Sequence, residues 1–259
     1  MLFTALLFSL GLLNDTPSSS ERVVVVLNDT TKVNSMVEKV KSKEWTAKES
    51  ETDLDSIANS YVNTKEAAIK LRLSLNENLI QGTITFDEIR SSFTNQLVDK
   101  IIPHWYGTPW SFGGHTTIPN QGKIACGYFI STTLRDMGIK LNRFTLAQKS
   151  PIDEAKMISC GEEINTIVQE THEKAFEEID NLTKEGLYFI SFDEEHAGYL
   201  LKCDGEFFLI HSNYLIPISV CIESLKEARV FKRYSKFHIV AISQNNTLLQ
   251  RWLDNSTVM

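Results

Sequence analysis

The sequence predicts an α+β domain in which amphipathic helices come first and a run of antiparallel strands follows. Apolar residues recur every three or four positions between residues 54 and 97, and again between 126 and 137, which is the period of a helix with one buried face. Only two residues separate the second strand-like run from the third, so these two strands must pair antiparallel. The strand-like runs cover residues 187–192, 196–203, 206–211 and 237–243.

Composition fits a globular chain with one large domain, or one domain plus an appendage. The 259 residues include 26 Lys and Arg against 33 Asp and Glu, which gives a formal net charge of −7. This acidic balance argues against a nucleic-acid partner, which would favour a basic stripe. The four cysteines are too few for a disulfide scaffold, and none lies close enough to another for a CxxC zinc site.

The N-terminus has the pattern of a secretory signal peptide. Leu2 to Leu13 is an almost uninterrupted apolar run, the right length for a signal-peptide core and too short to span a bilayer. Small residues at Ser18 and Ser20 offer a cleavage pattern. We therefore predict a signal peptide over residues 1–20 and a secreted or periplasmic protein without a membrane span. The alternative is a buried N-terminal helix.

Residues 21–98 are predicted to form a helical N-terminal segment. Arg22 to Leu27 resembles a short strand, and the helical period that follows stops at Gly82. Thr85 and Glu88 have the spacing of a capping box, which begins the next helix. The segment is either an appendage or the first layer of the domain.

The main domain is expected over residues 99–245. A loop rich in Gly, Pro and aromatic residues occupies 101–122, and a helix begins at about Cys126. Apolar spacing predicts a second amphipathic helix over Glu162 to Leu182, before the strands. Residues 246–259 are expected to be a C-terminal tail.

Cys126 is the first candidate for chemistry because it opens a predicted helix behind a Gly-rich loop. The N-terminus of a helix favours negative charge, so it lowers a thiol pKa and increases the fraction of nucleophilic thiolate. The alternative is that Cys126 is a small buried hydrophobic residue, which is the usual role of a free cysteine.

A predicted β-hairpin brings candidate partners together. Asp204-Gly205 between two strand-like runs is a strong signal for a two-residue turn, so Cys203 pairs with Glu206. The same register continues along both strands unless a bulge interrupts it.

With that register, His196, His211 and Asn213 lie on one face of the sheet, because side chains alternate with a period of two. His196 then has an orienting group on the neighbouring strand, either His211 or Asn213. A cysteine, a base and an orienting group form the arrangement of a thiol hydrolase. The alternative is two histidines on a half-buried sheet without a catalytic role.

Roughly residues 101–214 resemble the NlpC-type, papain-like cysteine peptidases. The family's glycine-rich loop, nucleophile helix, Gly-x-x-x-x-Arg element and two histidine strands occur here in the family's order. The matching residues are Gly107-Thr108-Pro109-Trp110, Gly113-Gly114, Cys126, Phe129, Gly138, Arg143, Gln148, His196-Ala197-Gly198-Tyr199-Leu200 and Leu209-Ile210-His211-Ser212.

The resemblance implies a papain-like fold and hydrolysis of an amide bond without a metal or cofactor. Cys126 would be the nucleophile, His196 the general base and His211 the third, orienting residue, with backbone N–H groups near the helix start binding the oxyanion. A peptide, in particular a peptidoglycan stem peptide, is the substrate class that the resemblance implies. Related acyltransferases and amidases acting outside the cell wall are the alternatives.

The chain departs from the family pattern around the nucleophile. Ala125 replaces the family's aspartate, Gly127-Tyr128 replaces Ser-Gly, and Trp110 replaces a tyrosine. Trp110, Tyr128 and Asn213 are the candidate substrate-binding residues. In the family, that aspartate helps to bind the free amino terminus of the peptide. Because it is absent here, we expect no preference for substrates with a free amino terminus. These departures also favour an alternative in which the fold is a binding module that has lost catalysis.

Overall fold

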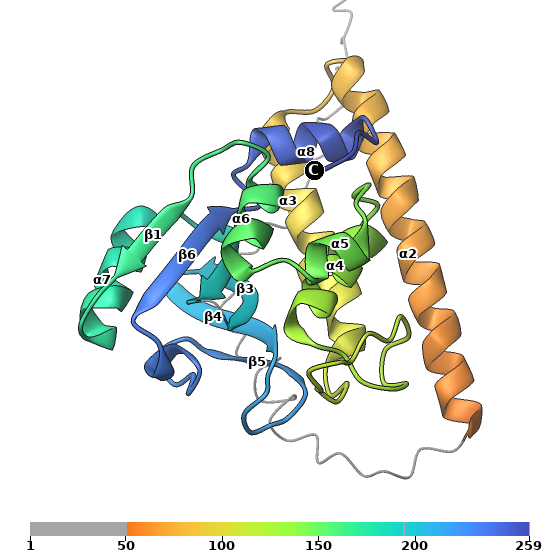
Figure 1. The fold of residues 1–259 in the computed structure, drawn as a ribbon. Helices are drawn as coiled ribbons and strands as arrows, with labels where there is room; N and C mark the ends of the chain where they lie inside the picture. Colours follow the sequence, from red (N-terminus) through yellow and green to blue (C-terminus); the bar gives the residue numbers. More distant parts are fainter. Residues whose placement is uncertain (1–50, 194, 259) are drawn as a thin grey trace, which may run out of the picture.

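The computed structural model describes residues 51–193 and 195–258, and the chain there adopts an α+β fold (Figure 1). This confirms the predicted class. The signal peptide predicted over 1–20 and the strand predicted over 22–27 lie outside the described residues.

A six-stranded sheet forms the centre of the fold. Its strand order is β1-β6-β2-β3-β4-β5, and every neighbouring pair is antiparallel. The strands are β1 (Asn165–Val168), β2 (Gly186–Phe192), β3 (His196–Cys203), β4 (Glu206–Ser212), β5 (Val220–Ser224) and β6 (Lys236–Ala241).

The helices come mainly before the strands. They are α2 (Glu51–Ile80), α3 (Phe86–Gln96), α4 (Cys126–Asp136), α5 (Arg143–Ala147), α6 (Pro151–Ser159), α7 (His172–Leu182) and α8 (Asn246–Leu253). Shorter helical turns cover η1 (Leu97–Ile101), η2 (Ile102–Trp105) and η3 (Phe231–Arg233). In Figure 1, α2 runs along the side of the molecule remote from α7.

Two hydrophobic cores lie on opposite faces of the sheet, since strand side chains alternate between the faces. The larger core joins α2, α3, α4 and α8 to the sheet and contains Phe93, Phe129 and Tyr199. The smaller core lies beneath α7 and contains Ile179 and Phe192. The helix that carries Cys126 is therefore fixed on both sides, by the sheet and by the N-terminal helices.

The N-terminal helices belong to the domain as its first layer. Trp105 donates its indole N–H to the Tyr61 hydroxyl at 2.8 Å, and Tyr61 donates to Asp136 Oδ2 at 2.7 Å, which connects α2, η2 and α4. The predicted capping box is confirmed, because Thr85 accepts from the Glu88 N–H and Glu88 accepts from the Thr85 N–H.

The helix predicted over Glu162–Leu182 is wrong in its first half. Asn165–Val168 is the edge strand β1, and α7 begins only at His172, after its N-cap Thr171. Thr166, Ile167 and Val168 are β-branched, and such side chains favour a strand when a partner such as β6 is present.

The C-terminal tail predicted over 246–259 is also wrong for most of its length. Asn245 caps α8 by accepting from the Leu248 N–H at 2.7 Å, and α8 buries Leu248, Leu249 and Trp252 in the larger core. The Trp252 indole donates to the Met137 carbonyl at 2.8 Å, so α8 closes over the end of α4.

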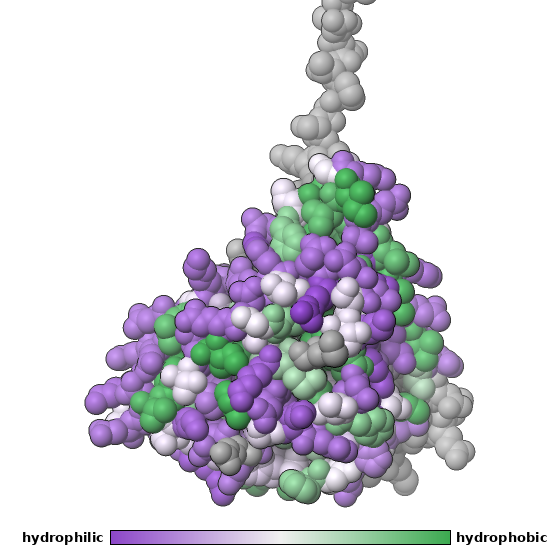
Figure 2. Space-filling model, turned by 45° about the horizontal axis from the view of Figure 1, so that its top comes forward, coloured by the Kyte–Doolittle hydropathy of each residue, from purple (hydrophilic) through white to green (hydrophobic). Residues whose placement is uncertain are grey.

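The surface mixes hydrophilic and hydrophobic residues, as Figure 2 shows for one face. Exposed large hydrophobic residues on α2 include Val62, Ile69, Leu73 and Ile80. Among the described residues, we find no helix with the length and hydropathy needed to cross a membrane.

Trp252→Ala should lower the free energy of unfolding by about 3–5 kcal/mol, because it empties a fully buried site and removes the bond to Met137. Denaturant unfolding followed by far-UV circular dichroism measures the change. Gln250→Ala on the exposed side of the same helix is the matched control, with an expected change within about 0.5 kcal/mol. Equal effects of the two substitutions would show that α8 is not a part of the core.

Candidate active site

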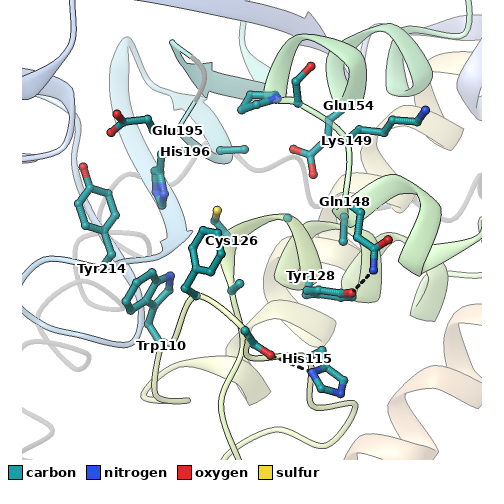
Figure 3. A pocket seen from close by; sticks show the side chains of 18 residues that line it. Trp110, His115, Cys126, Tyr128, Gln148, Lys149, Glu154, Glu195, His196 and Tyr214 are labelled. Carbon is teal, nitrogen blue, oxygen red and sulfur yellow. Dashed lines mark hydrogen bonds between the residues drawn. The ribbon is translucent and has the colours of Figure 1, made fainter.

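A cleft of about 720 Å³ opens where the start of α4 meets the sheet (Figure 3). Side chains from the glycine-rich loop, from the starts of α4 and α6, and from the loops at one end of the sheet line it. They include Trp110, Phe112, His115, Cys126, Tyr128, Gln148, Lys149, Glu154, Glu195, His196 and Tyr214. Cys126 and His196, predicted from far apart in the sequence, thus face one cavity.

The glycine-rich loop sets the position of Cys126. The Ala125 N–H donates to the Gly114 carbonyl at 2.8 Å, immediately before α4 begins. A Cβ on Gly114 would lie 2.6 Å from the Ile124 nitrogen, so only glycine permits this close approach of the two backbone segments. Arg143 fixes the same loop by donating to the carbonyls of His115 and Thr116.

Contacts between α4 and β3 bring the thiol to the sheet. The hydroxyls of Thr133 and Tyr199 are 2.7 Å apart, and this bond anchors α4 on the strand. At the start of the helix, the Cys126 sulfur accepts a hydrogen bond from the backbone N–H of Ala197, the residue after His196. The nucleophile candidate therefore lies directly beside the base candidate.

The predicted hairpin register is confirmed. Cys203 pairs with Glu206 and Tyr199 with Ile210 across β3 and β4, without a bulge between them. His196 Nε2 consequently lies 2.8 Å from Nδ1 of His211.

A carboxylate that the sequence did not indicate completes this chain. His211 Nε2 is 2.9 Å from Glu223 Oε1, on the neighbouring strand β5. A carboxylate accepts, so His211 donates from Nε2 and accepts at Nδ1, and His196 must donate from Nε2. The lone pair of neutral His196 is then on Nδ1, which is buried and has no hydrogen-bond partner among the described residues.

Asn213 is not brought to the cleft. Strand β4 ends at Ser212, and the Asn213 amide turns inward, accepting from the Leu215 N–H at 2.8 Å and lying 3.9 Å from the Cys221 sulfur. Of the two alternatives for the third residue, His211 holds the position. The prediction that Asn213 lines the substrate site is corrected by the end of the strand.

Trp110 and Tyr128 do line the cleft, as predicted. Trp110 packs against Tyr214 with ring centroids 6.0 Å apart, and Figure 3 shows both rings on the same side of the cavity. The Tyr128 hydroxyl accepts from Gln148 Nε2 at 3.0 Å, and the Arg143 guanidinium lies 5.0 Å from its ring centre. The aromatic walls are therefore held in place by their neighbours.

Burial has the largest effect on the pKa values of Cys126 and His196. It raises the pKa of Cys126 to about 11, with a further contribution from the charge of Glu154, although N–H groups of Ala197 and Gly127 act in the opposite direction. Burial and the neighbouring His211 hold the pKa of His196 well below its ordinary value. The helix start therefore acts in the expected direction, but desolvation exceeds its effect, so the net shift of the thiol pKa is upward.

One group of described residues has the chemistry of a metal site. Ligand-type atoms of His211, Cys221 and Glu223 lie within 4.8 Å of one another. Each of these side chains has a partner within the protein: His211 bonds to Glu223, and Asn213 bonds to Cys221.

Comparison of the chain with protein-family models, with curated proteins and with solved structures gives no match.

Alkylation of Cys126 by iodoacetamide should accelerate steadily between about pH 5 and pH 9, because a raised thiol pKa leaves only a small thiolate fraction that grows with pH. Site-resolved mass spectrometry measures the rate, with the partly exposed Cys160 of the same protein as an internal reference. A rate that is already constant at acidic pH would instead indicate a preformed thiolate–imidazolium pair.

Proposed function

We propose that the protein is a cysteine hydrolase of papain-like fold that cleaves an amide bond. The observation that carries the proposal is the hydrogen-bonded series from Glu223 through His211 to His196, whose imidazole lines the cleft together with Cys126. The tautomers derived above leave an unpartnered lone pair on a buried imidazole that shares the cleft with the thiol. If the two histidines only filled a half-buried sheet, there would be no physical reason for the hydrogen bonds to run in the direction that leaves this lone pair free.

The proposed reaction begins with a neutral thiol and a neutral imidazole. His196 Nδ1 takes the Cys126 proton as the sulfur attacks the carbonyl carbon, and His211 with Glu223 stabilises the resulting imidazolium. His196 then gives the proton to the leaving amine as the C–N bond breaks, which leaves a thioester. Water, deprotonated by His196, attacks the thioester, and the thiol is released together with a carboxylic acid product.

The start of α4 is suited to bind the tetrahedral oxyanion. The residue before the helix, Ala125, has no side chain that caps it, so the first N–H groups of α4 are not satisfied by a capping side chain. Such N–H groups stabilise the negative charge that develops on the carbonyl oxygen in the transition state.

For the substrate, we propose a peptide, with peptidoglycan stem peptides as the leading class. The resemblance of the motifs over residues 101–214 supports this choice, and the predicted signal peptide supports a secreted or periplasmic location. Trp110 and Tyr214 offer apolar ring faces at one side of the cleft, on which a sugar or an apolar side chain can pack.

Cys126→Ala should abolish turnover and leave the thermal transition nearly unchanged, because it removes the nucleophile and only one sulfur atom. Mass spectrometry of muropeptides incubated with the protein measures the new products. Cys160→Ala is the matched control and should retain full activity, since Cys160 lies at the end of α6 outside the cleft. Activity that survives in Cys126→Ala would refute the proposed function, and a wild-type protein without turnover would favour the binding module.

Substitutions at four polar residues should lower kcat by different amounts; these residues are His196, His211, Glu223 and Asn213. His196→Ala should cost about 10²–10⁴-fold, because it removes the general base. His211→Ala should leave a slower but measurable rate, and Glu223→Gln should cost less, since the amide keeps an acceptor oxygen for His211. Asn213→Ala is the control, because the hydrogen bonds of Asn213 are to Cys221 and Leu215 rather than to the two histidines. A larger loss in Asn213→Ala than in His211→Ala would show that Asn213 is the third residue.

A further inference from the structure

Glu154 is a buried carboxyl group that the proposed reaction does not use. It lies in the first turn of α6, its residue is 3% exposed, and it lines the same cleft as Cys126. A Cβ on Gly127 would lie 2.5 Å from Glu154 Oε1, so the carboxyl group rests against the first turn of the nucleophile helix. The lack of a side chain at Gly127 makes room for it.

No cation of the described part of the chain pairs with Glu154. None of the ion pairs or hydrogen bonds of the described residues reaches its carboxyl group, and burial alone raises its pKa well above the ordinary value. Lys149 lines the same cleft, but it is exposed, and Figure 3 shows its ammonium group pointing away from the carboxyl group. The neighbouring acid, Asp153, has a partner in Lys156.

An unpartnered carboxyl group in a buried position is costly, and an opposite charge of a ligand removes that cost. A primary ammonium fits best, because it donates hydrogen bonds and can be placed beside Glu154 within a cleft of about 720 Å³. The first turn of α6 also favours the ionised carboxylate that such a pair needs.

We infer that Glu154 forms a binding subsite for a primary ammonium group of the substrate, immediately beside Cys126. The inference rests on the proposed hydrolase function, since it assigns a chemical feature to the substrate of that reaction. The lack of an acid at Ala125 was the reason to expect no preference for a substrate with a free amine, and Glu154 removes that reason. Ala125 leaves the residue before the nucleophile without an acid, and Glu154 supplies one from a different helix.

Thiol reagents of matched shape test the subsite without requiring turnover. A 2-aminoethyl methanethiosulfonate carries an ammonium where the propyl reagent carries a methyl group, and both transfer their group to a cysteine sulfur as methanesulfinate leaves. The rates at Cys126 are measured by site-resolved mass spectrometry at neutral pH. The aminoethyl reagent should be favoured, and Glu154→Gln should reduce the ratio of the two rates by about tenfold, the effect of one hydrogen-bonded charge pair.

The neutral reagent separates loss of the subsite from damage to the fold. Glu154→Gln keeps the size of the side chain, so the propyl reagent should react at a rate within about twofold of the wild type while the preference for the aminoethyl reagent falls. Glu195→Gln is the matched control, because it removes the same charge from an exposed carboxylate of the same cleft. Its rate ratio should stay within about twofold of the wild type.

An unchanged ratio in Glu154→Gln, or an equal fall in Glu195→Gln, would overturn the subsite. In the unaltered protein, ethylammonium should also slow the propyl reagent at Cys126 more than sodium does at the same ionic strength, and equal rates would count against it. These readouts use no substrate. A protein whose Cys126→Ala variant remains active can therefore keep the subsite, and a confirmed hydrolase can lack it.

Discussion

The register of the β3–β4 hairpin is the constraint on which the rest of the site depends. Asp204 and Gly205 both have positive φ angles, 50° and 74°, as the tight turn requires, and Glu185 accepts from both of their N–H groups. A slip by one residue would send His196 and His211 to opposite faces of the sheet. One turn thus determines that two imidazoles, eight residues before it and six residues after it, meet at hydrogen-bond distance.

The second constraint is the docking of α4, which fixes how the sulfur approaches the sheet. Helix and strand are held by the Thr133–Tyr199 bond, and the end of the helix is covered by Trp252 of α8. Because the N-terminal and C-terminal helices bury this element from the far side, its first residue has little freedom. The geometry of the cleft therefore depends on parts of the chain that contribute no side chain to it.

The sequence predicted those features that follow from local rules. The hairpin turn, the capping box at Thr85 and the start of the helix at Cys126 each depend on a few adjacent residues. The edge strand β1 does not follow from local rules, because four residues carry too little periodicity and only pairing with β6 decides their conformation.

Glu154 and Glu223 could not be predicted in the same way. Glu154 lies on the buried face of α6, and Glu223 reaches His211 only because β5 pairs with β4, so neither position follows from adjacent residues alone. A glutamate on the otherwise apolar face of Pro151, Ala155 and Ile158 is nevertheless a usable signal.

Burial gives the cleft a single electrostatic character. The thiol, the imidazole and the Glu154 carboxyl group are all shifted toward their neutral forms, and desolvation is the first cause in each case. Such a site keeps its cysteine protonated when it is empty, which protects the sulfur from reagents that attack thiolates. A bound ammonium would favour the ionised form of Glu154 and balance the negative charge of that carboxylate. Under the proposed function, the ligand's ammonium group therefore lets the buried acid ionise without adding a net negative charge beside the neighbouring sulfur.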